Sequence, residues 1–74
     1  MMETLAMYTI YDRPKDYPAE FVARRFDIGA GTALPGPVVA RGKTLAEVRA
    51  QLPPGLYNLG RNPEDEPQIV ESWV

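Results

Sequence analysis

The stretch from Thr44 to Gly55, TLAEVRAQLPPG, contains the clearest helix pattern of this 74-residue chain. Thr44 is a favourable N-cap, and Glu47 follows it at the spacing of a reciprocal capping box. An apolar stripe at helical spacing is formed by Leu45, Val48 and Leu52. The Pro-Pro-Gly that follows ends the helix after about two turns, because a residue before proline avoids the α region. A helix this short does not persist alone, so we expect it to dock on a sheet.

The remainder of the chain is predicted to form strands and loops. Runs rich in aromatic and β-branched residues indicate strands, at residues 5–11, 20–28, 38–40, 55–60 and 68–74. Prolines and glycines predict loops between them, at 12–18, 29–37 and 61–67. The first two strands are expected to pair antiparallel. The order β-β-(β)-α-β-β predicts a single α+β domain over residues 1–74, a small antiparallel sheet with one short helix packed on one face.

The last predicted strand, QIVESWV, is apolar on both faces. Ile69 and Trp73 share one side of it, and Val70 and Val74 share the other. A strand of this kind is usually buried on both faces, whereas one helix covers only one face of a small sheet. Either loops and termini cover the second face, or a second subunit does, and we therefore expect a homodimer as one form of the protein.

The composition removes most catalytic and metal-binding chemistry. The chain has no cysteine and no histidine, which excludes disulfides and the usual zinc, haem or iron–sulfur ligands. Its lone serine, Ser72, lies inside a predicted strand, away from any spacing that supports nucleophilic catalysis. The acidic run at 64–66 fits a solvated turn better than a calcium loop or an acid–base pair, because the alternating D-x-D-x-D-G pattern is absent. We expect no enzyme activity, no metal and no cofactor.

Charge and hydropathy indicate the compartment. The formal net charge is −2 and the sequence pI is about 4.9, which argues weakly against non-specific binding to nucleic acid. The first residues, MMETLAMYTIY, have no basic flank and no long apolar run, so no signal peptide is expected. No segment approaches the roughly 20 apolar residues of a membrane span. The expected protein is soluble and cytoplasmic.

The triplet Gly42-Lys43-Thr44 has the letters of a phosphate-binding loop. That loop requires G-x-x-x-x-G-K-[ST], and its first glycine would fall at position 37, which is Pro37. Proline has no amide hydrogen and a fixed φ, so it cannot take part in a cradle of backbone N–H groups. We expect Thr44 to cap the helix and Lys43 to lie at the surface.

Basic residues support an alternative function in nucleic-acid binding. The candidates, which lie near aromatic side chains as in single-strand binders, are Arg24, Arg25, Arg41, Lys43 and Arg49. Adjacent residues of a strand point to opposite faces, so the Arg24-Arg25 pair is not expected to form one patch. One of the two is expected to pair across the sheet with Glu71 or Asp12.

Most of the chain resembles a type of short bacterial or phage protein of unassigned function. The shared stretches are MYTIYDRPKDYP near the start and VVARGKTLAEVRAQLPPGLYNLGRNPEDEPQIVESWV, with its terminal IVE-W strand. These motifs consist of turns, a helix cap and a final strand, so the resemblance implies a fold and no activity.

The preferred prediction is a non-catalytic protein-interaction or modulator module. Its partner is expected to be another protein or a second copy of itself, with no membrane and no metal involved. Tyrosine, tryptophan and arginine are over-represented at binding hot spots. The expected interaction residues are Arg24, Tyr57, Glu71 and Trp73.

Overall fold

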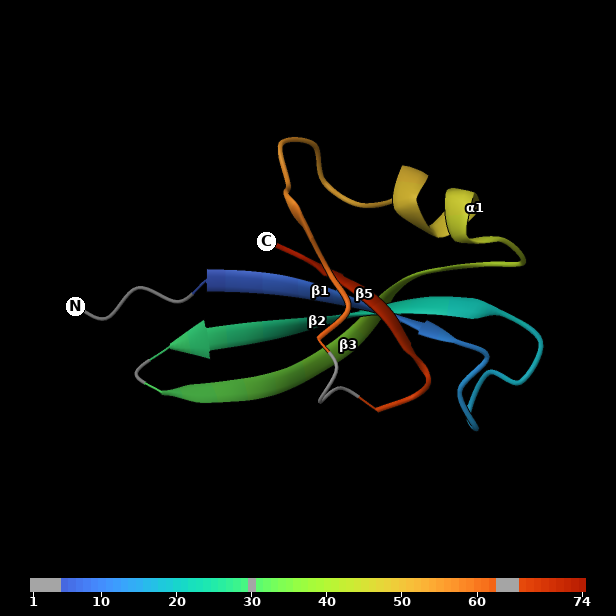
Figure 1. The fold of residues 1–74 in the computed structure, drawn as a ribbon, viewed down its shortest axis with the longest axis horizontal. Helices are drawn as coiled ribbons and strands as arrows, with labels where there is room; N and C mark the ends of the chain where they lie inside the picture. The colour runs from blue at the N-terminus through green and yellow to red at the C-terminus, as the bar shows by residue number, and fades with distance from the viewer. Residues whose placement is uncertain (1–4, 30, 63–65) are drawn as a thin grey trace.

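The predicted order of elements is found in the computed structural model, which describes residues 5–29, 31–62 and 66–74. The chain forms a small antiparallel five-stranded sheet with one short helix (Figure 1). The elements are β1 (Leu5–Asp12), β2 (Phe21–Gly29), β3 (Thr32–Gly42), α1 (Leu45–Ala50), β4 (Asn58–Gly60) and β5 (Ile69–Trp73). Among these residues, no helix is long and apolar enough to cross a membrane.

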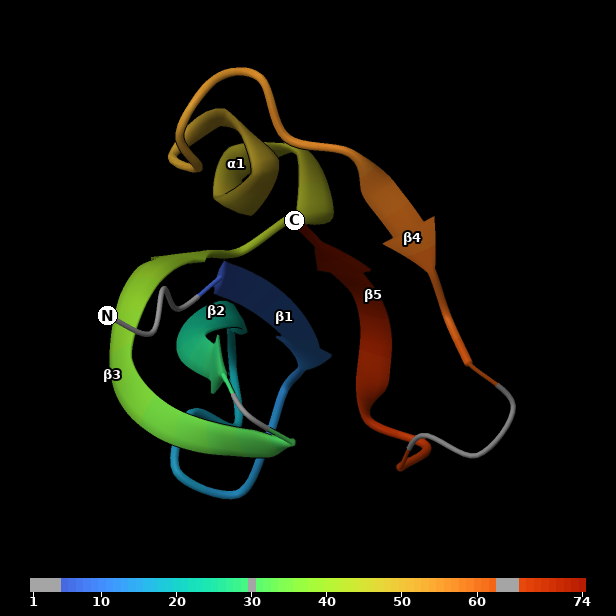
Figure 2. The same ribbon diagram turned by 90° about the vertical axis from the view of Figure 1, so that its left-hand side faces the viewer.

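The strand order of the sheet is β3-β2-β1-β5-β4, with every neighbouring pair antiparallel. β1 and β2 pair from Leu5↔Ile28 to Asp12↔Phe21, as predicted. The C-terminal strand β5 lies between β1 and β4. The sheet is strongly curled, and β3 bends around β2 at one end while β4 lies at the other end (Figure 2).

The prediction for residues 29–42 was wrong in extent. A loop at 29–37 followed by a short strand at 38–40 was expected, but one strand runs from Thr32 to Gly42. Its pairing with β2 has two irregularities, and such bulges bend a strand and increase its twist. A Cβ on Gly36 would lie 2.7 Å from the Arg25 carbonyl oxygen, so this glycine permits a close approach of two backbones. Prolines are tolerated here because β3 is an edge strand.

The main core lies between the sheet and α1. It consists of four buried side chains from four elements: Ile10, Ala23, Ala40 and Val48. The predicted apolar stripe of α1 is confirmed, because Val48 is fully buried and Leu45 and Leu52 pack partly buried against the cluster. Complete burial of a valine side chain contributes roughly 1.5–3 kcal/mol, so this single residue supplies much of the docking energy of a short helix.

The Gly-Lys-Thr triplet leads from the end of β3 at Gly42 to the N-cap of α1 at Thr44. The Thr44 hydroxyl accepts a hydrogen bond from the Glu47 amide at 3.2 Å, and the Glu47 carboxylate accepts one from the Lys43 amide at 2.7 Å. The return bond therefore reaches the residue before the cap, whereas a capping box places it on the cap itself. A Cβ on Gly42 would lie 2.7 Å from Glu47 Cβ and Oε2, so the glycine leaves room for this carboxylate. Gly42 and Thr44, two residues of the Gly-Lys-Thr triplet, thus have structural roles.

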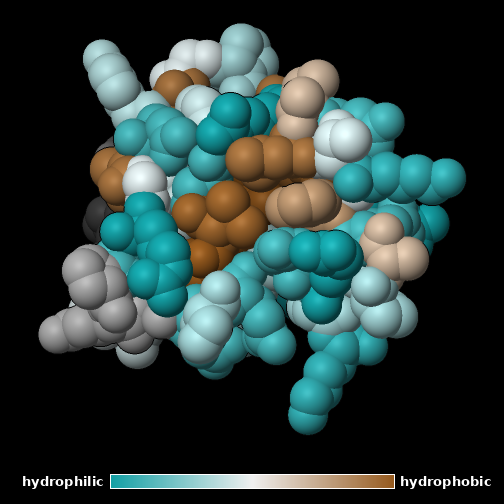
Figure 3. Space-filling model, turned by 45° about the vertical axis from the view of Figure 1, so that its right-hand side comes forward, coloured by the Kyte–Doolittle hydropathy of each residue, from teal (hydrophilic) through white to brown (hydrophobic). Residues whose placement is uncertain are grey.

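The second face of the sheet is also covered in part. Thr9 and Val22 are buried, and their pairing positions place them on the face opposite Ile10. A hollow beside Val22 is lined by residues of the β1–β2 loop and of the segment before β5, so loops contribute to covering this face. The apolar residues of β5 are half-buried on both faces. A hydrophobic area bordered by hydrophilic side chains remains visible on the molecular surface (Figure 3).

Candidate functional site: the β4 edge and its anchor

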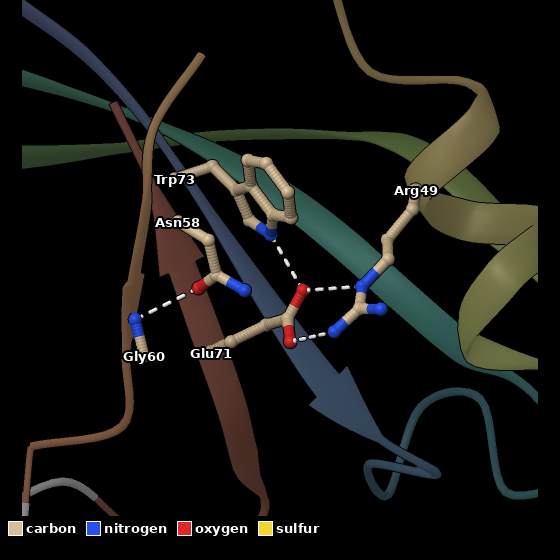
Figure 4. A network of polar contacts seen from close by, with 5 residues as sticks. All are labelled: Arg49, Asn58, Gly60, Glu71 and Trp73. Atoms are coloured by element: carbon tan, nitrogen blue, oxygen red, sulfur yellow. Dashed lines mark hydrogen bonds and ion pairs between the residues drawn. The ribbon is translucent and has the colours of Figure 1, made fainter.

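A buried carboxylate joins the helix to the C-terminal strand. Glu71 of β5 pairs with Ile10 of β1, which places its side chain on the face that α1 covers. Arg49 Nε donates to Glu71 Oε2 at 2.8 Å, and a second guanidinium nitrogen donates to Oε1. The side chain of Glu71 is 6% exposed and that of Arg49 is 44% exposed. The carboxylate is therefore the buried partner. The Arg49 side chain extends from α1 to reach it (Figure 4).

Two further side chains complete this network. The Trp73 indole N–H donates to Glu71 Oε2, and the Arg49 guanidinium carbon lies 5.9 Å from the centroid of the Trp73 ring. Asn58 of β4 pairs with Trp73, and its side chain contributes to the lowered pKa of Glu71. We call Arg49, Asn58, Glu71 and Trp73 the Glu71 network. It connects α1, β4 and β5.

The network lowers the pKa of Glu71 below its ordinary value. The hydrogen bonds from Arg49 are the largest cause, and burial opposes them. The hydrogen bond from Trp73, the positive charge of Arg49 and the Asn58 side chain lower the pKa further. The same hydrogen bonds raise the pKa of Arg49. Both groups are therefore charged at neutral pH, and the carboxylate has several donors to satisfy its oxygens.

The strand that this network holds is short and lies at the edge of the sheet. The Tyr57 amide donates to the Val74 carbonyl at 2.7 Å, and the Val74 amide donates to the Tyr57 carbonyl at 3.0 Å. In an antiparallel ladder the next residue turns its backbone N–H and C=O the other way. The backbone of Asn58 is thus directed toward the open side, because β4 has a neighbouring strand on one side only among the described strands.

Two large side chains project into solvent beside this backbone. Tyr57 is 78% exposed and Leu59 is 61% exposed. The Asn58 side chain turns back and accepts a hydrogen bond from the Gly60 amide at 2.8 Å, and Gly60 has a φ of +71°, a conformation that favours glycine. These contacts end the strand. We call Tyr57, Asn58 and Leu59 the β4 edge.

The structure brings together three of the four predicted interaction residues. Glu71 and Trp73 belong to the network, and Tyr57 lies next to it in the β4 edge. Arg24 lies elsewhere, on the opposite face of the sheet, where it donates to the Gly36 carbonyl at 2.9 Å and pairs with Asp16.

The predicted cross-sheet partner of the Arg24-Arg25 pair was wrong. Arg24 pairs with Asp16 and Arg25 with Asp27, whereas Glu71 is held by Arg49 and Asp12 pairs with Arg13. Sequence reasoning also missed Asn58 and Leu59. Sequence reasoning named Glu71 as a possible partner of an arginine, and a carboxylate in an apolar strand does require a donor, but it named the wrong arginine.

The basic residues proposed for nucleic-acid binding do not share one surface. Arg24 and Arg25 lie on opposite faces of β2, and three of the five candidates are bound to carboxylates of the chain. Arg41 lies over the Tyr17 ring, 5.5 Å from its centroid. The structure therefore places Arg24 and Arg25 on different surfaces.

Two open hollows lie elsewhere on the surface. One, of about 290 Å³, is lined by residues that include Tyr17, Arg41 and Gln51. The other, of about 210 Å³, contains Asp16 and Glu66, and the Asp16 carboxylate is paired with Arg24 there. Within residues 5–29, 31–62 and 66–74, no group of three His, Cys, Asp or Glu side chains is placed to hold a metal ion. Most of the acidic run at 64–66 falls outside these residues.

Comparison of the chain with family models, with curated proteins and with solved structures found no match.

Proposed function

We propose that this protein is a non-catalytic interaction module that binds another polypeptide chain along the β4 edge. The observation that carries this proposal is the exposure of Tyr57 and Leu59 at an open sheet edge. Natural sheets usually protect their edges against pairing with other chains. An edge that exposes two large apolar side chains next to free backbone groups is instead suited to strand addition, in which backbone hydrogen bonds and side-chain contacts act together.

The Glu71 network supports this proposal because it makes the edge rigid. β4 has only three residues, and a strand of this length would not hold a fixed geometry by backbone pairing alone. The Asn58 side chain is held by the Gly60 amide, and the Trp73 side chain is held by Glu71 on the neighbouring strand. Ordering a flexible segment opposes association, so a strand that is already ordered binds with a smaller entropic loss.

The same network supports a non-catalytic role. A general acid or base works best with a pKa near the working pH and with access to substrate. Glu71 has a lowered pKa, and its buried carboxylate is hydrogen-bonded to Arg49 and Trp73. The hydroxyl of Ser72 is in a hydrogen bond with Thr9 at 3.3 Å. Neither group is positioned for chemistry at the β4 edge.

Binding of a protein is better supported than binding of nucleic acid. The guanidinium groups of Arg24, Arg25 and Arg49 are matched by carboxylates, which reduces the local positive potential that phosphate binding requires. We further propose that the module acts in the cytoplasm, since a chain without cysteine is compatible with a reducing compartment.

The test compares two leucines with matched exposure on opposite edges of the sheet. Leu59 of the β4 edge is 61% exposed and Leu34 of β3 is 63% exposed. The full chain and its Leu59→Ala and Leu34→Ala variants would be immobilised, and proteins retained from lysate of the source cells would be quantified by mass spectrometry. We expect retained proteins that Leu59→Ala loses and Leu34→Ala keeps. Identical sets for all three baits would contradict the proposal.

A purified candidate partner is then titrated against the chain in solution. Trp73 is the sole tryptophan and lies opposite Asn58 in the sheet, so its emission reports directly on occupation of the edge. A partner without tryptophan should change this emission for the wild type and the Leu34→Ala variant, and should leave the Leu59→Ala variant unchanged at the same concentrations.

A further inference from the structure

The two edges of the sheet differ in how they are protected. β3 contains Pro35 and Pro37, which lack backbone N–H donors, and its pairing with β2 is interrupted twice. Prolines, bulges and very short strands all oppose the pairing of an edge with another chain. β4 contains no proline, and the backbone of Asn58 faces outward, but the strand has only three residues and one irregularity in its pairing with β5. Pairing with another chain is thus opposed along β3 and limited to a short ladder at β4.

The sequence around Asn58 is complementary to itself. If two copies pair antiparallel about a two-fold axis at Asn58, the two Asn58 residues lie opposite each other. Tyr57 then lies opposite Leu59 of the partner subunit, and the reverse contact is made on the other side of the axis. Cross-strand pairs of an aromatic and an aliphatic residue stabilise a sheet. Contacts that repeat in this way are those of an isologous two-fold interface.

Charge also permits this pairing. Residues 53–60 contain no charged side chain, so two copies of the edge meet without repulsion between like charges. A like-charged pair directly opposite would destabilise the ladder. The outward N–H and C=O of Asn58 are also in the correct position, because residues facing each other in a hydrogen-bonded pair exchange both bonds.

We propose that the partner at the β4 edge is a second copy of this chain, paired antiparallel through β4 about an axis at Asn58. This inference rests on the proposed function and specifies its partner. The resulting dimer has one continuous ten-stranded sheet, in which each subunit contributes five strands. The ladder is short, because the Gly60 amide is already bonded to the Asn58 side chain. Apolar contacts between Tyr57 and Leu59 therefore supply most of the affinity, and the dimer is a weak one of small interface.

The first experiment measures molar mass against concentration by sedimentation equilibrium, together with Trp73 emission. The variants are Leu59→Lys and its matched control Leu34→Lys. A lysine at an edge opposes strand pairing, so Leu59→Lys should weaken dimerisation by at least about tenfold, and Leu34→Lys should change it by less than about twofold. Thermal unfolding of both variants verifies that each is folded. A monomer at all concentrations, or equal weakening by the two variants, would overturn the proposal.

The second experiment tests the register. The chain has no cysteine, so single Tyr57→Cys and Leu59→Cys variants each introduce one thiol. In the proposed register, position 57 of one subunit faces position 59 of the other as a non-hydrogen-bonded pair, about 4.5 Å apart at Cα. This distance is within the range that a disulfide spans.

An equimolar mixture of the two variants, oxidised in air, should therefore form mostly mixed disulfide dimers, which intact-mass spectrometry distinguishes from either homodimer. Equal yields of mixed and self-linked species would show a different register and refute the axis at Asn58. If the protein is monomeric but its Leu59-dependent capture of another protein persists, self-pairing fails and the proposed function survives. If that capture is absent as well, both fail.

Discussion

The Arg49–Glu71 pair allows a prediction in which the two single substitutions differ in cost. Arg49→Met removes the donor and leaves a carboxylate whose side chain is 6% exposed. Glu71→Gln removes the charge from the buried side and leaves a guanidinium that is 44% exposed. Without its partner, the Arg49 guanidinium can reach water by a small rotation of its side chain, whereas the Glu71 carboxylate cannot. We expect Arg49→Met to be the more destabilising change.

The expected losses in the free energy of unfolding follow from the burial of the two side chains. Removing one partner of a buried ion pair costs about 3–5 kcal/mol, and Arg49→Met should approach the lower end because Trp73 still bonds to Glu71. Glu71→Gln keeps an acceptor oxygen of similar shape, and loss of charge assistance should cost about 1–2 kcal/mol. The total stability expected for 74 residues is roughly 4–11 kcal/mol, so either loss is readily measured.

The stability that Glu71 contributes should decrease as the pH falls. The pKa of Glu71 is lowered in the folded state, so its contribution to stability is fully present above the pKa of the unfolded chain, about 4.3. This contribution is lost as the pH falls through the lower folded-state pKa. The wild type should therefore lose stability in acid more steeply than Glu71→Gln. The free-energy difference between Arg49→Met and the wild type should also shrink in acid, because protonation removes the buried charge.

Denaturant unfolding at a series of pH values measures these differences, with Trp73 emission as a local probe and far-ultraviolet circular dichroism as a global one. Coincident transitions by the two probes would justify a two-state treatment. The proposed asymmetry would be refuted if Glu71→Gln cost as much as Arg49→Met at pH 7. It would also be refuted if the cost of Arg49→Met were constant between neutral and acidic pH.

Two further predictions concern α1. Gly42→Ala places a Cβ 2.7 Å from Glu47 Cβ and should lower the free energy of unfolding by about 1–2 kcal/mol. Thr44→Ala removes only the cap and should lower it by about 1 kcal/mol. Equal stability of Gly42→Ala and wild type in denaturant unfolding would show that the capping geometry is wrong. Val48→Ala leaves a cavity beside Ile10 and should lower the free energy of unfolding by about 2 kcal/mol, which a lower thermal midpoint would show. An unchanged midpoint would mean that the helix is not docked as described.

Local features were predicted well from the sequence. Thr44, Glu47 and the apolar stripe of α1 act within one helical turn or two, so their spacing alone specified the helix and its buried side. The antiparallel pairing of β1 and β2 was also accessible, because consecutive strands usually lie side by side. Residues 29–37 were misassigned because prolines and glycines favour loops in general, whereas an edge strand with bulges accepts them.

The candidate site depended on contacts between distant parts of the chain. Glu71 and Arg49 are separated by 22 residues, and no local pattern specified that they would meet. The insertion of β5 between β1 and β4 decided which strand became an edge, and hence that Tyr57 and Leu59 would be exposed. The sequence by itself therefore determined the short-range elements, because propensity, capping and side-chain alternation act over a few residues. The tertiary structure alone decided the partner of the buried carboxylate and the open edge, because these depend on strand order.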